Sequence, residues 1–185
     1  MGKDDRLLEM GWSAIDTGDY DKALTLSILL LESDPDLAEA YNLRGNVLAV
    51  LGHHGNAIDA FDRALELRPD YAEAHYFRGL SHQELKAYRK AIADFTTAIR
   101  NGFGMAEVYN ARGASHACCG NERSAIRDFT TAVKLDPGFG LAWYNRGVLY
   151  AKRDGDCNHA VADILCAAKL GIGPAKAWLN KLATS

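Results

Sequence analysis

Apolar residues recur along the chain with the spacing of amphipathic helices, in segments that come in pairs. Over residues 38–52, apolar side chains at Tyr41, Val47, Leu48 and Leu51 fit one face of a helix that ends at Gly52. The next segment carries its apolar residues on one face before Pro69 stops the helix, at Ala57, Phe61, Ala64, Leu65 and Leu67. The pattern therefore predicts an all-helical chain built from pairs of consecutive helices.

The helix pair recurs with a period of 34 residues, and several residue types follow that period independently. Glycine does so at Gly11, Gly45, Gly79, Gly113 and Gly147, and arginine precedes the last four at Arg44, Arg78, Arg112 and Arg146. Alanine recurs at Ala23, Ala57, Ala91 and Ala125 and then, one residue late, at Ala160. The aromatic position is Phe61, Phe95 and Phe129, continued by Ile164. Proline marks unit ends at Pro35, Pro69 and Pro137, with Phe103 where a fourth is missing. Agreement among these series predicts five tandem units.

Glycine at one fixed phase of a helix needs a packing reason, because glycine inside a helix costs roughly 1 kcal/mol relative to alanine. We expect the glycine and alanine series to mark the place where the two helices of a unit approach too closely for larger side chains. The aromatic series would then fill the space beside that crossing.

The motifs NLRG, YFRG, NARG and YNRG, with the Ala, Phe, Ala and Pro positions that accompany them, closely resemble the tetratricopeptide repeat over about residues 4–173. The resemblance implies an all-α fold, a right-handed α-α superhelix or solenoid of five helix-pair repeats, whose first helices line a concave groove. The chain departs from the pattern in three places. Unit one has Met10 in place of the arginine, unit three lacks its terminal proline, and unit five gains one residue around DGDCNH.

The predicted repeats span about residues 4–37, 38–71, 72–105, 106–139 and 140–173, and no linker separates them. A solenoid must cover its open ends. Residues 174–184 begin with Pro174 and carry Ala175, Trp178, Leu179 and Leu182 on one stripe, which predicts a C-terminal capping helix stabilised mainly by burial of Trp178. We therefore expect a single domain over residues 1–185.

Charge and composition exclude several classes of partner. The net charge of −3, with acidic and basic residues mixed throughout, predicts neither nucleic acid nor an anionic membrane as partner. No apolar run is long enough for a signal peptide at the N-terminus or for a membrane span. Four cysteines show no disulfide framework and predict reduced thiols, and with them a cytoplasmic location: Cys118, Cys119, Cys157 and Cys166.

The repeated arginines have acidic residues at a shared position of the second helix, where Asp94, Asp128 and Asp163 follow Arg78, Arg112 and Arg146. Because the acids recur in step with the repeat, we expect an ion pair within each unit that fixes the helix crossing. The alternative is a row of arginines that binds an acidic ligand.

Chemistry beyond binding has little support in the sequence. His82 and His116 occupy equivalent core-facing positions, with Cys119 one turn after His116, but no CxxC or HxxxH spacing accompanies them. Packed histidines and a buried thiol are therefore favoured over a metal site. No phosphate-binding loop, nucleophile elbow or HExxH motif occurs. We predict no catalytic residue and no cofactor; an enzyme with a Cys/His site is the weakest alternative.

The resemblance also implies which residues line the groove. The expected peptide-binding residues are Asn42, Asn46, Tyr76, Leu80, Gln83, Asn110 and Tyr144, accompanied by Val50, Ala114 and Val148. Asn and Tyr suit an extended peptide, because they hydrogen-bond a backbone of any sequence. Glu39, Glu73 and Glu107 near one rim favour a neutral or basic segment. The alternative is a solvated face that binds nothing.

Unit one is apolar nearly all round, which is typical of a helix pair buried on more than one side. Its second helix has Ile28 and Leu29 where the middle units have polar residues, and Leu8, Trp12 and Ile15 add apolar groups on its first helix. We predict that these five residues form an association surface for a homodimer or a partner protein. The sequence thus predicts a protein-interaction module or adaptor, with a self-associating structural subunit that has no groove ligand as the alternative.

Overall fold

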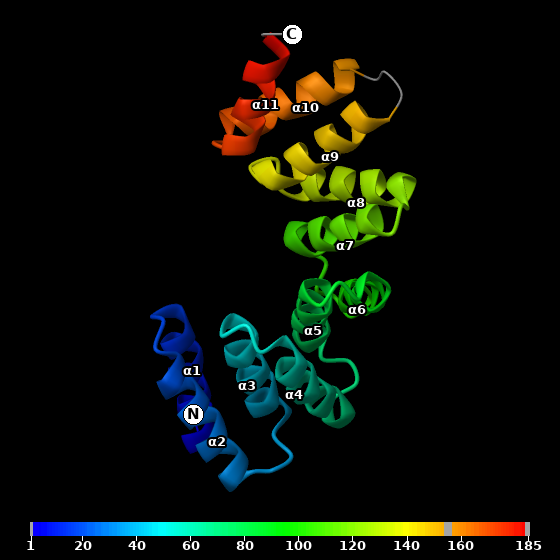
Figure 1. Ribbon diagram of the computed structural model, residues 1–185. Coiled ribbons are helices and arrows are strands. Elements are labelled where there is room, and N and C mark those ends of the chain that lie inside the picture. Colours follow the sequence, from blue (N-terminus) through cyan, green and yellow to red (C-terminus); the bar gives the residue numbers. More distant parts are fainter. Residues whose placement is uncertain (1, 154–156, 184–185) are drawn as a thin grey trace. The chain divides into compact units, whose positions relative to one another are not determined.

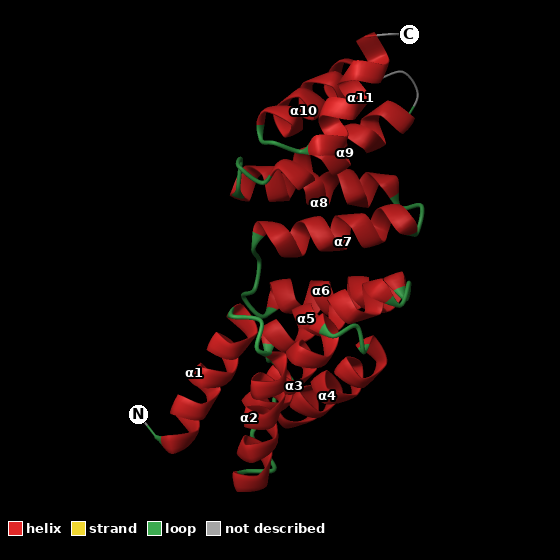
Figure 2. Cartoon of the chain, turned by 60° about the vertical axis from the view of Figure 1, so that its left-hand side comes forward, coloured by secondary structure: helices red, strands yellow, loops and turns green. Residues whose placement is uncertain are grey.

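The computed structural model describes residues 2–153 and 157–183, within which lie eleven helices and no strand (Figure 1, Figure 2). The helices of the first three repeats are α1 (Lys3–Asp16), α2 (Tyr20–Ser33), α3 (Ala38–Val50), α4 (His54–Leu67), α5 (Ala72–Glu84) and α6 (Tyr88–Arg100). Those that follow are α7 (Ala106–Cys118), α8 (Glu122–Leu135), α9 (Gly140–Lys152), α10 (Cys157–Lys169) and α11 (Gly173–Ala183). The predicted fold class, an all-α solenoid of five helix pairs and a closing helix, is confirmed.

The helices group into two compact units, one ending at Phe103 and the other beginning at Gly104. In the first unit each helix packs on the next, and among the first helices α1 contacts α3 and α3 contacts α5. In the second unit α7 to α11 pack in the same successive way, with α7 against α9. First helices of neighbouring repeats therefore lie side by side within each unit. The expectation of one domain over residues 1–185 stays a prediction.

The repeated glycines lie where the two helices of a repeat meet, as their fixed phase predicts. A Cβ atom added to Gly45, Gly79 or Gly113 would lie 2.6 to 2.8 Å from a ring carbon of the phenylalanine sixteen residues later. Those rings, Phe61, Phe95 and Phe129, are almost completely buried. Any side chain in place of the glycine would displace the ring, since interiors are close-packed.

Repeat one reaches the same packing by another route. Its second helix has the small Ser27 at the phenylalanine position, and a Cβ atom on Gly11 would instead lie 2.4 Å from a methyl carbon of Leu43 in the next repeat. Leu43 and Leu30 are fully buried there, with Leu8, Trp12 and Ile15 packed against them. The core of repeat one is thus shared with repeat two.

Helix α11 closes the second unit at about the place that the sequence predicts. Ala175 is buried with Ile164 and Ala167, and Trp178 and Leu179 pack on the same cluster while remaining partly exposed. The extra residue expected around DGDCNH falls largely on residues 154–156, outside the described residues.

Candidate functional site

The three predicted ion pairs between the repeated arginines and aspartates are present. Each guanidinium donates from Nε and Nη2 to the two carboxylate oxygens of its aspartate, with donor–acceptor distances between 2.6 and 3.0 Å: Arg78–Asp94, Arg112–Asp128 and Arg146–Asp163. Such bidentate geometry fixes orientation as well as charge. The aspartates are buried and the arginines mostly so, as expected for pairs that join the two helices of a repeat.

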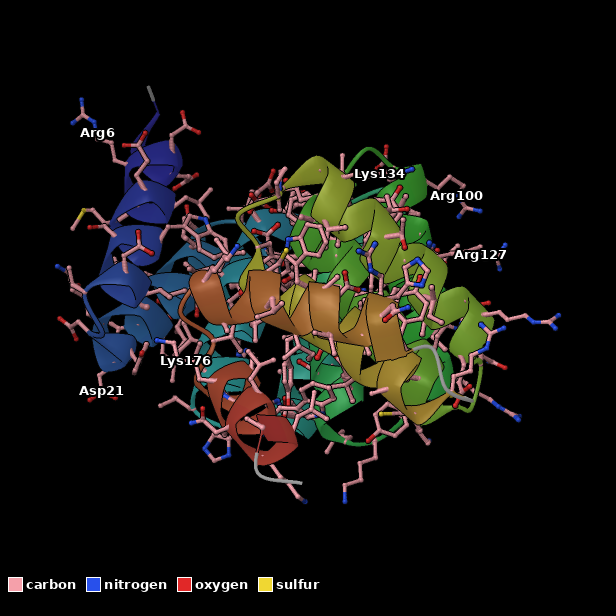
Figure 3. The ribbon with its side chains drawn as sticks, turned by 90° about the horizontal axis from the view of Figure 1, so that it is seen from above. Arg6, Asp21, Arg100, Arg127, Lys134 and Lys176 are labelled. Atoms are coloured by element: carbon pink, nitrogen blue, oxygen red, sulfur yellow. The ribbon has the colours of Figure 1, made fainter. Side chains whose placement is uncertain are left out.

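Residues around these pairs extend the network to neighbouring helices. Nη1 of Arg78 donates to Asp62 on the preceding second helix at 2.6 Å, and Nη1 of Arg146 donates to Thr130 at 3.1 Å. The Arg112 and Arg146 guanidinium groups also lie over the rings of Tyr109 and Trp143. By contrast, Arg100, Arg127 and Lys134 project outward from their helices (Figure 3). Three of the four repeated arginines, Arg78, Arg112 and Arg146, are therefore occupied within the fold.

Burial and hydrogen bonds shift the titration of this network. Burial raises the pKa of Asp94, but hydrogen bonds from His75 and Arg78 outweigh it and leave the pKa below its ordinary value. Burial lowers the pKa of His82 and of His116, only partly opposed by Asp94 and Asp128 respectively. At neutral pH, both histidines are therefore mainly in the neutral imidazole form in the folded chain.

In the first unit, the predicted groove residues differ in accessibility. Asn42 and Asn46 are 1% and 7% exposed. The Asn42 amide donates to the Tyr71 hydroxyl at 3.2 Å, and the Asn46 amide donates to the Asn42 carbonyl at 3.0 Å. Both amides thus have partners inside the repeat.

The other three predicted groove residues of this unit are partly exposed on α5: Tyr76, Leu80 and Gln83. The Tyr76 ring lies against three other rings, those of Phe77, Phe95 and Phe103, with centroids 5.1 to 6.0 Å apart. Phe103 stands where repeat three lacks its proline. It therefore packs against Tyr76, a predicted groove residue. These ring contacts restrict the orientations that the Tyr76 side chain can take.

In the second unit, Asn110 and Tyr144 lie on adjacent first helices and are partly exposed. The Asn110 side-chain oxygen accepts a hydrogen bond from the Asn145 amide at 2.9 Å. Tyr144 packs at the edge of the cluster that α10 and α11 bury. That all seven predicted residues contribute to one groove stays a prediction.

A cavity of about 460 Å³ lies within the first unit, beside the first turns of α3 and α5. It is lined by Glu39, Arg68, Asp70, Tyr71, Ala72, Glu73, Asn101, Gly102 and Phe103. Two of the predicted rim glutamates, Glu39 and Glu73, thus meet in one place. Arg68 is the single basic residue of the lining, and it forms an ion pair with Glu39 and lies over the Tyr71 ring. The cavity keeps an excess of negative charge.

The sequence did not predict the acidic cavity as a whole, because part of its lining comes from the loops that end repeats two and three. Asp70 and Arg68 flank the proline that ends repeat two, and Asn101 to Phe103 replace the proline of repeat three. The one signal of the cavity in the sequence was the recurrence of glutamate in the first turn of three first helices, at Glu39, Glu73 and Glu107.

The five residues of the predicted association surface fall into two groups. Leu8, Trp12 and Ile15 pack into the core shared by repeats one and two. Ile28 and Leu29 are 43% and 46% exposed on α2. Packing against repeat two accounts for the first group, and the second group remains an apolar patch on the surface.

Other kinds of site find no support in the described part of the chain. No three His, Cys, Asp or Glu side chains come together there in a way that could hold a metal ion. None of the described helices is both long and apolar enough to cross a membrane. Cys118, Cys119 and Cys166 are free thiols, of which Cys118 is exposed.

Comparison with known proteins gives the following matches. The sequence profile described as tetratricopeptide repeat matches residues 8–72 and 42–106. No curated protein matches the chain. A crystal structure of MamA is 25% identical, with a TM-score of 0.78 over 90% of this chain and 96% of that one. MamA from Desulfovibrio magneticus is 23% identical, with a TM-score of 0.81 and coverages of 92% and 96%. YrrB, titled a TPR protein with an unusual peptide-binding site, is 24% identical, with a TM-score of 0.77 and coverages of 95% and 90%.

Proposed function

The chain belongs to the tetratricopeptide repeat family, and we propose that it is a protein-interaction module whose first unit binds a neutral or basic polypeptide segment. The segment would lie along the first-helix face, over Tyr76, Leu80 and Gln83, and place a lysine or arginine in the acidic cavity. A fold that also hosts the peptide-binding site named for YrrB is suited to such a role. Three points stay predictions: binding at Asn110 and Tyr144 in the second unit, a cytoplasmic location, and the absence of nucleic acid among the partners.

The observation that carries this proposal is the imbalance of charge in the cavity. Glu39 neutralises Arg68, whereas Asp70 and Glu73 make no ion pair within the described residues. A cationic side chain would form ion pairs with both carboxylates, while the Asn101 side-chain oxygen and the loop carbonyls accept further hydrogen bonds from it. An acidic segment would meet like charge at the same place, which favours neutral and basic partners.

Selection from a displayed library of random peptides tests the proposal, because such a library offers basic, neutral and acidic segments together. The wild-type chain should enrich peptides with lysine or arginine, and a chain carrying Asp70→Asn and Glu73→Gln should bind them about tenfold more weakly, since each exposed charge pair contributes up to roughly 1 kcal/mol. Glu107→Gln, at the equivalent position of the second unit, is the matched control and should bind normally. If the wild type selects no basic peptides, or the double variant binds them equally well, the proposed site is wrong.

Exposure of Ile28 and Leu29 favours self-association through repeat one as a second candidate function. Leu29→Glu should then shift an oligomer towards the monomer in light scattering, because it places a charge in an apolar contact. Leu135→Glu, which alters a similarly exposed leucine on α8, should leave the mass unchanged. A wild-type chain that stays monomeric at high concentration would exclude this candidate.

A further inference from the structure

One of the repeated arginines has lost the acid that holds the others. Arg44 has Ala60 at the position of α4 where the following repeats have an aspartate. The acid on the preceding second helix is missing as well. Arg78 donates to Asp62 there, and the equivalent residue for Arg44 is Ile28. Arg44 is exposed, and its guanidinium makes no ion pair or side-chain hydrogen bond within the described residues. The cation has therefore been kept in repeat two without either of its partners.

The missing carboxylate leaves open space beside the arginine. A cavity of about 250 Å³ is lined by Tyr41, Arg44, Leu48, Asn56, Asp59 and Ala60. Arg44 and Ala60 border the same cavity, which means that the volume filled by the aspartate side chain in other repeats has not been filled by a larger residue nearby. A carboxylate from another molecule has room to enter.

One wall of this cavity, the Tyr41 ring, has counterparts beside two of the complete ion pairs. Tyr41 occupies the position of Tyr109 and Trp143, whose rings support the arginines of their repeats. Tyr41 and Leu48 are packed partly into the core of repeat two, so one side of the cavity is apolar. An ion pair covered on that side by a partner would be strengthened by the lower dielectric.

The remaining polar residues of the lining, Asn56 and Asp59, favour a ligand with a single negative charge. The Asn56 amide can donate to the second oxygen of a carboxylate. Asp59 borders the cavity and forms no ion pair with Arg44. Its carboxylate would repel a doubly charged phosphate more strongly than a singly charged acid.

We infer that Arg44 and this cavity, which we call the Arg44 pocket, bind an aspartate or glutamate side chain of a partner protein, flanked by an apolar residue that contacts Ile28. The exposure of Ile28 on the neighbouring helix supplies the apolar contact. The site is separate from the proposed groove, because Arg44 lies two residues from Asn42 and from Asn46, about 200° around helix α3. The two faces of α3 would thus take ligands of opposite charge.

Two blocked tripeptides serve as the probe, acetyl-Leu-Glu-Leu-amide and its neutral counterpart acetyl-Leu-Gln-Leu-amide. The Arg44 side-chain Nε–H resonance of the full ¹⁵N-labelled chain, assigned by its loss in Arg44→Gln, reports binding. The Glu peptide should shift this resonance in a saturable way, with about tenfold tighter binding than the Gln peptide, as expected for a charge-assisted hydrogen bond. Inorganic phosphate should give a smaller shift at the same concentration.

Ala60→Asp supplies the missing carboxylate from within the chain and should abolish the response to the Glu peptide. The variant should melt at or above the wild-type temperature, since it restores the ion pair that three other repeats contain. Arg100→Gln removes an exposed arginine elsewhere in the unit and should leave binding unchanged. The inference is overturned if Glu and Gln peptides act alike, if neither shifts the resonance, if phosphate gives the larger shift, or if Ala60→Asp still binds. None of these results depends on the acidic cavity, so this site and the proposed groove can fail separately.

Discussion

Replacing Gly79 by alanine tests whether close packing of the two helices explains the repeated glycine. The new Cβ atom would lie 2.7, 2.9 and 3.2 Å from three carbons of the Phe95 ring. The ring is fully buried and cannot swing into solvent. Gly55→Ala is the matched control, because Gly55 is also in a helix and a Cβ atom there would meet nothing within 4 Å.

The expected effect is the difference between two opposing terms. Overpacking a filled core costs about 1–3 kcal/mol, whereas alanine is favoured over glycine in a helix by roughly 1 kcal/mol. Because three ring carbons are too close at once, we expect the upper part of the first range and a net loss of about 1–2 kcal/mol for Gly79→Ala. Gly55→Ala retains only the favourable term and should gain about 0.5–1 kcal/mol.

Thermal unfolding followed by circular dichroism measures both changes. For a chain of this length, 1 kcal/mol corresponds to about 2–4 °C, so Gly79→Ala should melt about 3–6 °C lower and Gly55→Ala about 1–3 °C higher. Phe95→Leu removes the end of the ring, and in that background the Gly79→Ala penalty should shrink by at least about 0.5 kcal/mol. The packing argument fails if Gly79→Ala melts at or above the wild-type temperature, or if its penalty is unchanged when Phe95 is leucine.

Two further predictions concern the buried charges. Asp128→Asn removes the carboxylate that pairs with Arg112, whose side chain is 18% exposed, and should cost about 3 kcal/mol in chemical denaturation. Asp59→Asn changes an exposed residue and should alter stability by less than about 0.5 kcal/mol. Equal effects would contradict the structural role of the pair. Because burial lowers the pKa of His82 and His116, the unfolded chain binds protons first as the pH falls below about 6.5, so stability should fall between pH 7.5 and pH 5.5. The variant with both histidines changed to glutamine should lose less of its melting temperature over that range. Asp94, whose pKa is lowered, adds a loss in the same direction only below about pH 4.

The fold followed from the sequence because its main packing device repeats. Glycine and phenylalanine lie sixteen residues apart in repeats two to four, as Gly79 and Phe95 do, so their contact could be inferred without coordinates. The arginine–aspartate pairs could be inferred for the same reason. Contacts that occur once could not. The hydrogen bond from Asn42 to Tyr71 and the packing of Phe103 on Tyr76 depend on loop geometry that no periodicity encodes. They are the contacts that decide how accessible the groove positions are.

Repetition also separates structural residues from candidate binding residues. A residue whose partner recurs with it, as Asp128 does with Arg112, is accounted for by the fold. Where one member stays and the other is lost, the fold no longer explains the survivor, and a partner outside the chain becomes the simplest reason for an open cavity beside it. Arg44 with Ala60 meets that condition in repeat two. Leu29 does not meet that condition. It is an exposed leucine, and single exposed leucines are common on protein surfaces without a ligand. The Arg44 pocket is therefore a sharper test of partner binding than the apolar surface of repeat one.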